Sequence, residues 1–123
     1  MEEYMNNTTL SAGTLTGDTV KNRAGEELGT VEEIMIDLRT GRVAYTVLAA
    51  GGVLGLGEKF FAIPWELLQV DTENHAVVVD LDAETIENAP GFDKDNWPDA
   101  GDMTWLDEVY AYYQREPFWK TPV

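Results

Sequence analysis

The stretch GTVEEIMIDLRTGRVAYTVLAA, residues 29–50, decides the fold. Apolar side chains recur with a period of two in both halves of it, as in Ile34, Ile36 and Leu38, and this period is typical of a β-strand. Between the two halves, Gly41 in the RTG triplet supplies the left-handed backbone conformation that a short turn needs. The stretch therefore predicts an antiparallel hairpin.

Further strand-like runs flank this hairpin at intervals of about 8 to 12 residues, separated by turn signals. They are TLTGDTV at 14–20, KFFAI at 59–63, LQVD at 68–71 and AVVVDL at 76–81. The last two, joined by the turn signal TENH, predict a second hairpin. PWELL, between the second and third of these runs, predicts one helical turn because proline is accepted at a first helical position. Strands at this spacing favour a small β-barrel or sandwich, and a closed barrel removes the strand edges that invite aggregation.

The chain divides into three segments by composition. Residues 1–13 are polar and carry no pattern, which predicts a flexible arm. Residues 14–92 hold the strand signals and end in a short helix. Residues 93–123 consist of a polar link and an amphipathic aromatic helix in TWLDEVYAYYQRE, for which we expect Thr104 as the N-cap and Pro117 as the stop.

The glycine-rich stretch GGVLGLGEKFFAIPW, residues 51–65, is similar at first sight to a phosphate-binding loop. The spacing of Gly52 and Gly57 fits G-x-x-x-x-G-K-[ST], but Glu58 follows where the motif needs lysine, and its charge would repel a phosphate. We therefore interpret the stretch as a connector between strands, with three aliphatic side chains that face a core or a partner. These are Val53, Leu54 and Leu56.

Composition limits the class of protein. The chain has 123 residues, enough for one domain, and no cysteine, which excludes disulfides and thiolate metal sites. Its formal net charge is −15, from 23 acidic and 8 basic residues. This balance disfavours binding to nucleic acid or to an anionic membrane, because both need clustered cations. We expect no signal peptide and no direct membrane insertion, and hence a cytoplasmic protein.

The side chains that commonly carry catalysis are scarce. Ser11, the one serine, falls in the predicted arm and His75, the one histidine, in a predicted turn, so a Ser–His–acid triad is not expected. DKDNWPDAGD, residues 93–102, has the composition of a calcium loop but departs from D-x-[DN]-x-[DN]-G at Trp97 and Pro98. We expect no enzyme and no cofactor, and the possibility of a weak cation site in this acidic link stays open.

In combination, several motifs resemble the PRC-barrel family. They are G-E-x-L-G-x-V at Gly25–Val31, I-D-x-x-T-G-R-V at Ile36–Val43, the glycine-rich connector, and I-P-W at Ile63–Trp65. The resemblance covers residues 14–92, and the tail is similar to that of the stand-alone soluble members. It implies a mainly β fold, a six-stranded PRC-type β-barrel with a short helix, followed here by the C-terminal aromatic helix. It also implies a role in docking macromolecules rather than a reaction.

Aromatic residues gather in the C-terminal segment, and tyrosine and tryptophan dominate the energetics of protein interfaces. Either this segment packs back on its own barrel, or part of it forms an interface with another chain. The residues predicted as an interaction surface are Val53, Leu54, Leu56, Trp97, Trp105, Tyr112, Tyr113, Phe118 and Trp119.

These observations predict a non-enzymatic docking or adaptor module that binds proteins and self-associates as a homodimer. The sequence does not identify the protein partner. The alternative is a module that binds a small ligand or a divalent cation at the barrel mouth or the acidic link.

Overall fold

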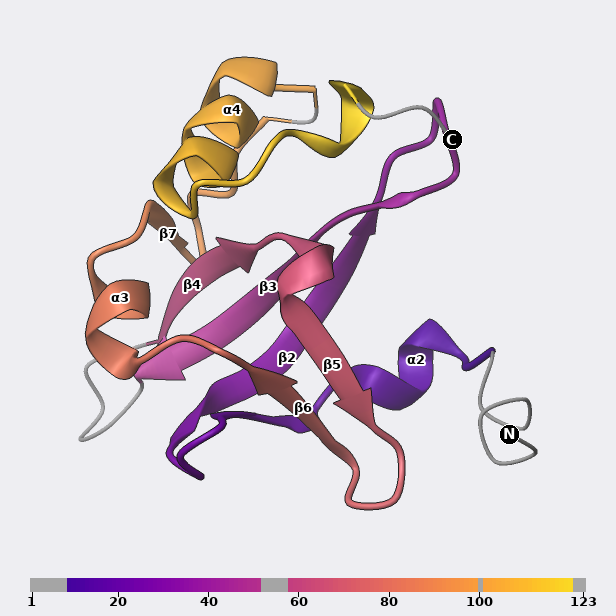
Figure 1. The fold of residues 1–123 in the computed structure, drawn as a ribbon. Coiled ribbons are helices and arrows are strands. Elements are labelled where there is room, and N and C mark those ends of the chain that lie inside the picture. Colours follow the sequence, from indigo (N-terminus) through magenta and orange to yellow (C-terminus); the bar gives the residue numbers. More distant parts are fainter. Residues whose placement is uncertain (1–8, 52–57, 100, 121–123) are drawn as a thin grey trace.

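The computed structural model describes residues 9–51, 58–99 and 101–120, and its centre is a seven-stranded sheet in the order β5-β6-β1-β2-β3-β4-β7 (Figure 1). The strands are β1 (Thr19–Asn22), β2 (Glu27–Ile36), β3 (Val43–Gly51), β4 (Glu58–Ile63), β5 (Leu68–Asp71), β6 (Ala76–Val79) and β7 (Gly91–Asp93). The helices are α2 (Ala12–Leu15), α3 (Ala83–Glu87) and α4 (Met103–Tyr112), with short 3-10 turns η2 (Trp65–Leu67) and η3 (Phe118–Lys120). The fold is mainly β, as the sequence predicts.

The predicted central hairpin is confirmed. β2 and β3 pair in antiparallel fashion with Ile36 opposite Val43, and the turn between them passes through Gly41 at a φ of 76°. The second predicted hairpin, β5 with β6, also forms, and the helical turn expected after Pro64 is η2. β1 joins the two hairpins because it pairs antiparallel with β2 and parallel with β6.

The predicted six-stranded closed barrel is not confirmed. Within the described residues, β5 pairs with β6 and β7 pairs with β4, so the sheet has two edge strands and does not close. β7 is a strand that the sequence analysis missed. Its three residues follow Pro90, and pairing with β4 places Phe92 opposite Phe60. So short a run carries no readable period, and its strand conformation comes from the neighbouring strand.

The N-terminal part of the chain differs from the strand predicted at 14–20. Its first residues belong to α2, Gly17 then turns the chain at a φ of 88°, and β1 starts after it. Leu15 is buried, and the Gly17 N–H donates to the carbonyl oxygen of Val31 at 2.8 Å. Packing against β2 therefore overrides the local strand preference. Most of the predicted arm 1–13 lies outside the described residues.

The aromatic helix α4 forms, but both of its predicted ends were wrong. The N-cap is Asp102 rather than Thr104, because Asp102 Oδ1 accepts a hydrogen bond from the Trp105 N–H at 3.0 Å. The helix ends before Gln114, whose φ is 57°, and so before Pro117. Aspartate and threonine are both good caps, and the sequence offers both within one turn, so propensity alone could not choose between them.

The core lies on both faces of the central strands. Residues 44–49 of β3 and 60–63 of β4 are buried without interruption, so the alternation read in the sequence of β3 does not mark a solvent-facing side. α4 covers one part of the sheet through Trp105, whose ring contacts Tyr45 of β3 and Phe92 of β7. Figure 1 shows α4 above β7 and α3 beside the start of β4.

A close backbone approach occurs at Gly29 in β2. A Cβ atom placed there would lie 2.2 Å from the carbonyl oxygen of Ala49 on β3, far inside van der Waals contact. Gly29 also lies opposite Val20 of β1. The second glycine of the G-E-x-L-G-x-V motif is thus required where three strands meet.

Gly29→Ala is expected to lower the free energy of unfolding by about 2 kcal/mol or more, because the added Cβ meets backbone that can move only with the whole strand. Urea denaturation followed by circular dichroism measures this. Gly13→Ala in α2 is the control, since the nearest atom to its Cβ would be Ser11 Oγ at 3.6 Å, and its effect should stay within about 0.5 kcal/mol. Equal stability of Gly29→Ala and the wild type would contradict the close approach.

Candidate functional site

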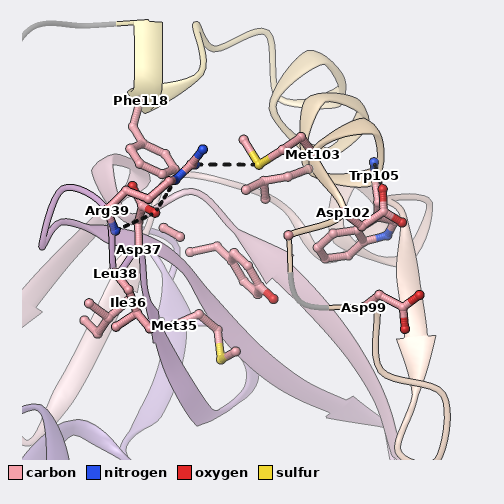
Figure 2. Close-up of a pocket in the computed structure, with 14 residues that line it drawn as sticks. Met35, Ile36, Asp37, Leu38, Arg39, Asp99, Asp102, Met103, Trp105 and Phe118 are labelled. Carbon is pink, nitrogen blue, oxygen red and sulfur yellow. Dashed lines mark hydrogen bonds and ion pairs between the residues drawn. The ribbon is translucent and has the colours of Figure 1, made fainter.

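A groove of about 380 Å³ lies where the tip of the β2–β3 hairpin faces the start of α4 and η3 (Figure 2). We call it the tip groove. Its apolar lining comes from two segments far apart in the sequence, 35–45 and 103–118. The main apolar side chains are Met35, Ile36, Leu38, Met103, Trp105 and Phe118.

Aromatic packing fixes the α4 side of the tip groove. The ring of Trp105 meets Tyr45 edge-on, with centroids 5.6 Å apart, and Phe92 at 5.8 Å. On the η3 side, the Arg42 guanidinium lies over the Phe118 ring, 5.3 Å from its centroid. Edge-to-face and cation–π contacts of this kind restrict the rotation of the rings, so the wall has a defined shape.

The opposite wall is the hairpin turn, which Asp37 organises. Its carboxylate accepts hydrogen bonds from Thr40 Oγ1 at 2.8 Å, from Arg39 Nε at 3.1 Å and from the Arg39 N–H at 3.3 Å. Its carbonyl oxygen accepts from the Gly41 N–H at 2.8 Å. The hydrogen bond from Thr40, followed by those from Arg39, holds the pKa of Asp37 below its ordinary value. The turn is therefore held in one conformation by an ionised carboxylate.

Two aliphatic side chains at this tip remain in solvent. Leu38 is 92% exposed and Ile36 is 48% exposed. Single exposed apolar side chains are common on proteins, but these two adjoin an apolar groove. Met35 and Met103, on its two walls, carry flexible thioethers that adapt to differently shaped neighbours. Apolar surface thus continues from the exposed tip into the tip groove.

Arg39 connects the two walls. Its Nη2 donates to Met103 Sδ at 3.8 Å while its Nε donates to Asp37, and Figure 2 shows the side chain reaching from the turn toward the helix. On the α4 side, Asp99 and Asp102 add two carboxylates to the lining. The tip groove therefore has an apolar interior with charged groups around it.

Tyrosines hold α4 on both the sheet and α3 of its own chain. The Tyr110 hydroxyl donates to the Ala44 carbonyl oxygen at 2.7 Å, and the Tyr112 hydroxyl donates to the Thr85 carbonyl oxygen at 2.6 Å. Tyr113 is buried, and burial raises the pKa of both Tyr110 and Tyr113. Both groups stay neutral at physiological pH, so Tyr110 keeps the proton that it donates.

The structure brings together only part of the predicted interaction surface. Trp105 and Phe118 line the tip groove. Trp97 packs on Phe92 with centroids 4.9 Å apart, and Trp119 packs on a tyrosine of α4. Tyr112 and Tyr113, described above, face the interior of this chain. Three predicted residues lie outside the described residues: Val53, Leu54 and Leu56.

Sequence reasoning missed the strand side of the tip groove. Met35, Ile36 and Leu38 were taken into account only as strand residues, and Met103 was not singled out. One signal was present: Leu38 stands between Asp37 and Arg39 in a turn, where polar residues normally occur.

The residues considered for catalysis or metal binding stay apart. His75 lies in the exposed turn between β5 and β6, and Ser11 lies exposed before α2. Among the described residues, no three histidine, aspartate or glutamate side chains come close enough together to hold a metal ion. In the same part of the chain, no helix has the length and apolar character needed to cross a bilayer.

Comparison with known proteins agrees with this fold. The sequence matches the PRC-barrel domain family over residues 7–86, which include β1 to β6. The chain therefore belongs to the PRC-barrel domain family. A similar solved structure is that of a Pseudomonas aeruginosa protein provisionally assigned as the 16S ribosomal RNA processing protein RimM, with 18% identity and a TM-score of 0.44. The similarity covers 65% of this chain and 48% of that one, so this chain spans about half of its length. No curated protein matches the sequence.

Trp105→Ala is expected to lower the free energy of unfolding by about 2–3 kcal/mol, because it removes the ring contacts with Tyr45 and Phe92 beneath α4. Urea denaturation measures the change. Asp107→Ala, at an exposed position of the same helix, is the comparison, and its effect should stay within about 0.5 kcal/mol. An unchanged unfolding midpoint for Trp105→Ala would show that its ring does not support the helix.

Proposed function

We propose that this chain is a non-enzymatic, cytoplasmic docking module that binds another protein through the tip groove. One observation carries the proposal: Leu38 in the hydrogen-bonded hairpin turn and Ile36 at the end of β2 are both exposed, and both line the apolar tip groove. Water at such a surface is released when a partner covers it, and this release favours association. Contiguous exposed apolar surface with a polar rim is typical of interaction sites.

The rigidity of the tip groove supports the same proposal. Asp37 fixes the turn through hydrogen bonds from Thr40 and Arg39, and Trp105 is fixed by its ring contacts. A surface that is already ordered loses little conformational entropy when a partner binds, so more of the interaction energy appears as affinity.

Charge and family resemblance favour a protein over a nucleic acid as the partner. The net charge of −15 opposes contact with phosphates. The resemblance to the PRC-barrel family implies a docking role rather than a reaction, although a shared fold does not fix a function. The evidence for a particular docking site comes from the tip groove, since membership of the family does not identify one.

Leu38→Ser is expected to weaken partner binding by about 10-fold or more without changing the unfolding midpoint, because Leu38 is 92% exposed and contributes little to the core. Val70→Ser is the matched control, since Val70 is an exposed aliphatic residue on the edge strand β5. Proteins retained from a lysate by the wild type and by Val70→Ser, but lost with Leu38→Ser, are purified and titrated by calorimetry.

Titration of each purified candidate partner decides whether the tip groove is the docking site. Tight binding to the wild type and to Val70→Ser, with the expected loss for Leu38→Ser, supports docking at the tip groove. If purified candidates bind Leu38→Ser as tightly as the wild type, the tip groove is not the docking site.

Self-association remains a separate prediction. Light scattering at two protein concentrations should show a mass that rises from that of one 13.7 kDa chain toward twice that mass. Because each copy carries a charge of −15, higher salt should favour the dimer by screening the repulsion. A mass of one chain at both concentrations, in low and in high salt, would contradict the homodimer.

A further inference from the structure

We infer that the partner segment seated in the tip groove carries a bulky apolar side chain flanked by lysine or arginine. The inference rests on the docking function proposed above and concerns the chemistry of the partner. Two properties of the described residues carry it: the apolar lining of the tip groove and the excess of carboxylates around that lining.

The apolar lining of the tip groove favours a bulky apolar side chain of the partner segment, which we call the anchor. A volume of about 380 Å³ accommodates a bulky side chain between Trp105, Met103 and the strand residues. At the outer side of the groove, Ile36 and Leu38 are exposed and extend its apolar lining along the hairpin tip. A segment lying there would bury its anchor in the groove and cover Leu38 with neighbouring residues. Binding energy in such interfaces concentrates on one or a few buried anchors.

The carboxylates select the residues beside the anchor. Of the described residues that line the tip groove, Asp37, Asp99 and Asp102 are acidic and Arg39 is basic. Asp37 binds Arg39 Nε at 3.1 Å, so these two charges offset each other. Arg42, whose guanidinium lies over the Phe118 ring, adds a second positive charge on the η3 side, so three carboxylates face two cations. Asp99 and Asp102 lie on the α4 side, and Asp102 also accepts the hydrogen bond from the Trp105 N–H that caps α4.

A cation on the partner would therefore find two carboxylates next to the apolar interior. Lysine and arginine form charge-assisted hydrogen bonds with carboxylates, and such bonds are stronger than those between neutral groups. At the rim of an interface, complementary charge mainly raises the association rate and excludes partners of the wrong sign. Asp99 and Asp102 thus determine which apolar segments can enter.

Net charge decides between a second copy of this chain and a different protein. A second copy would bring another −15 and the same acidic residues to the tip groove, so long-range repulsion opposes that occupant. A basic segment is attracted at long range and meets unlike charges at contact. The occupant that the observations favour is therefore a basic, apolar-anchored segment of another protein.

A random peptide library displayed on phage, selected on the full chain, tests the inferred chemistry. Peptides that bind the wild type but not Leu38→Ser are synthesised and titrated by fluorescence anisotropy. We expect them to share a bulky apolar residue with lysine or arginine beside it. Their dissociation constants should rise with salt, because salt screens the contacts with Asp99 and Asp102.

Two double variants, each removing two negative charges, isolate the local effect. Asp99→Asn/Asp102→Asn removes the two carboxylates on the α4 side while asparagine at 102 still caps α4. Glu27→Gln/Glu73→Gln is the control, because these exposed residues lie at the far end of β2 and in the β5–β6 turn. The first pair should weaken binding of the basic peptides about 3- to 10-fold, and the second less than about 2-fold.

The outcomes separate this inference from the docking function. Leu38-dependent peptides with neutral or acidic flanks, or equal effects of the two double variants, would overturn the inferred chemistry and leave docking intact. A selection that yields no Leu38-dependent peptide would contradict docking at the tip groove itself. A homodimer that is lost with Leu38→Ser would show that a second copy occupies the groove, and the inferred basic partner would then be wrong.

Discussion

Antiparallel pairing between β2 and β3 is the constraint on which the other elements depend. β1 adds to the free side of β2 and β4 to the free side of β3, so the register of this one pair positions the whole sheet. The pairing needs a close backbone approach at Gly29, where a side chain would collide with Ala49. At the other end of the same ladder the register fixes the turn between Ile36 and Val43, and thus the direction of the hairpin tip.

The tip groove exists because a distant segment is fixed against that tip. Arg39 contacts Met103 across 64 positions of sequence, and Tyr110 donates to the carbonyl oxygen of Ala44 across 66. The second of these bonds is buried, and moving α4 away would break it and expose the apolar surface around it to water. One side of α4 therefore packs on the sheet, and another side forms a wall of the tip groove.

The family fold accounts for only one of the two walls. The match to the PRC-barrel domain ends at residue 86, whereas Asp99, Asp102, Met103, Trp105 and Phe118 all lie beyond it. The shared domain thus supplies a rigid hairpin tip, and the C-terminal segment of this chain supplies the aromatic wall and two of the three carboxylates. The proposed docking function therefore needs both the shared domain and the C-terminal segment. The fold of the shared domain by itself does not identify it.

The sequence by itself determined the features that depend on neighbours a few positions apart: the hairpin at 29–50, the hairpin at 68–79 and the existence of an aromatic helix. Period two, turn glycines and aromatic spacing act over that range. For the site, the sequence identified Trp105 and Phe118 but not Leu38. Whether the sheet closes and which apolar side chains stay in solvent were decided by the tertiary structure alone. These depend on segments far apart in the sequence, such as Met103 beside Arg39 and Tyr110 on Ala44, and no local pattern records which surfaces a distant segment will cover.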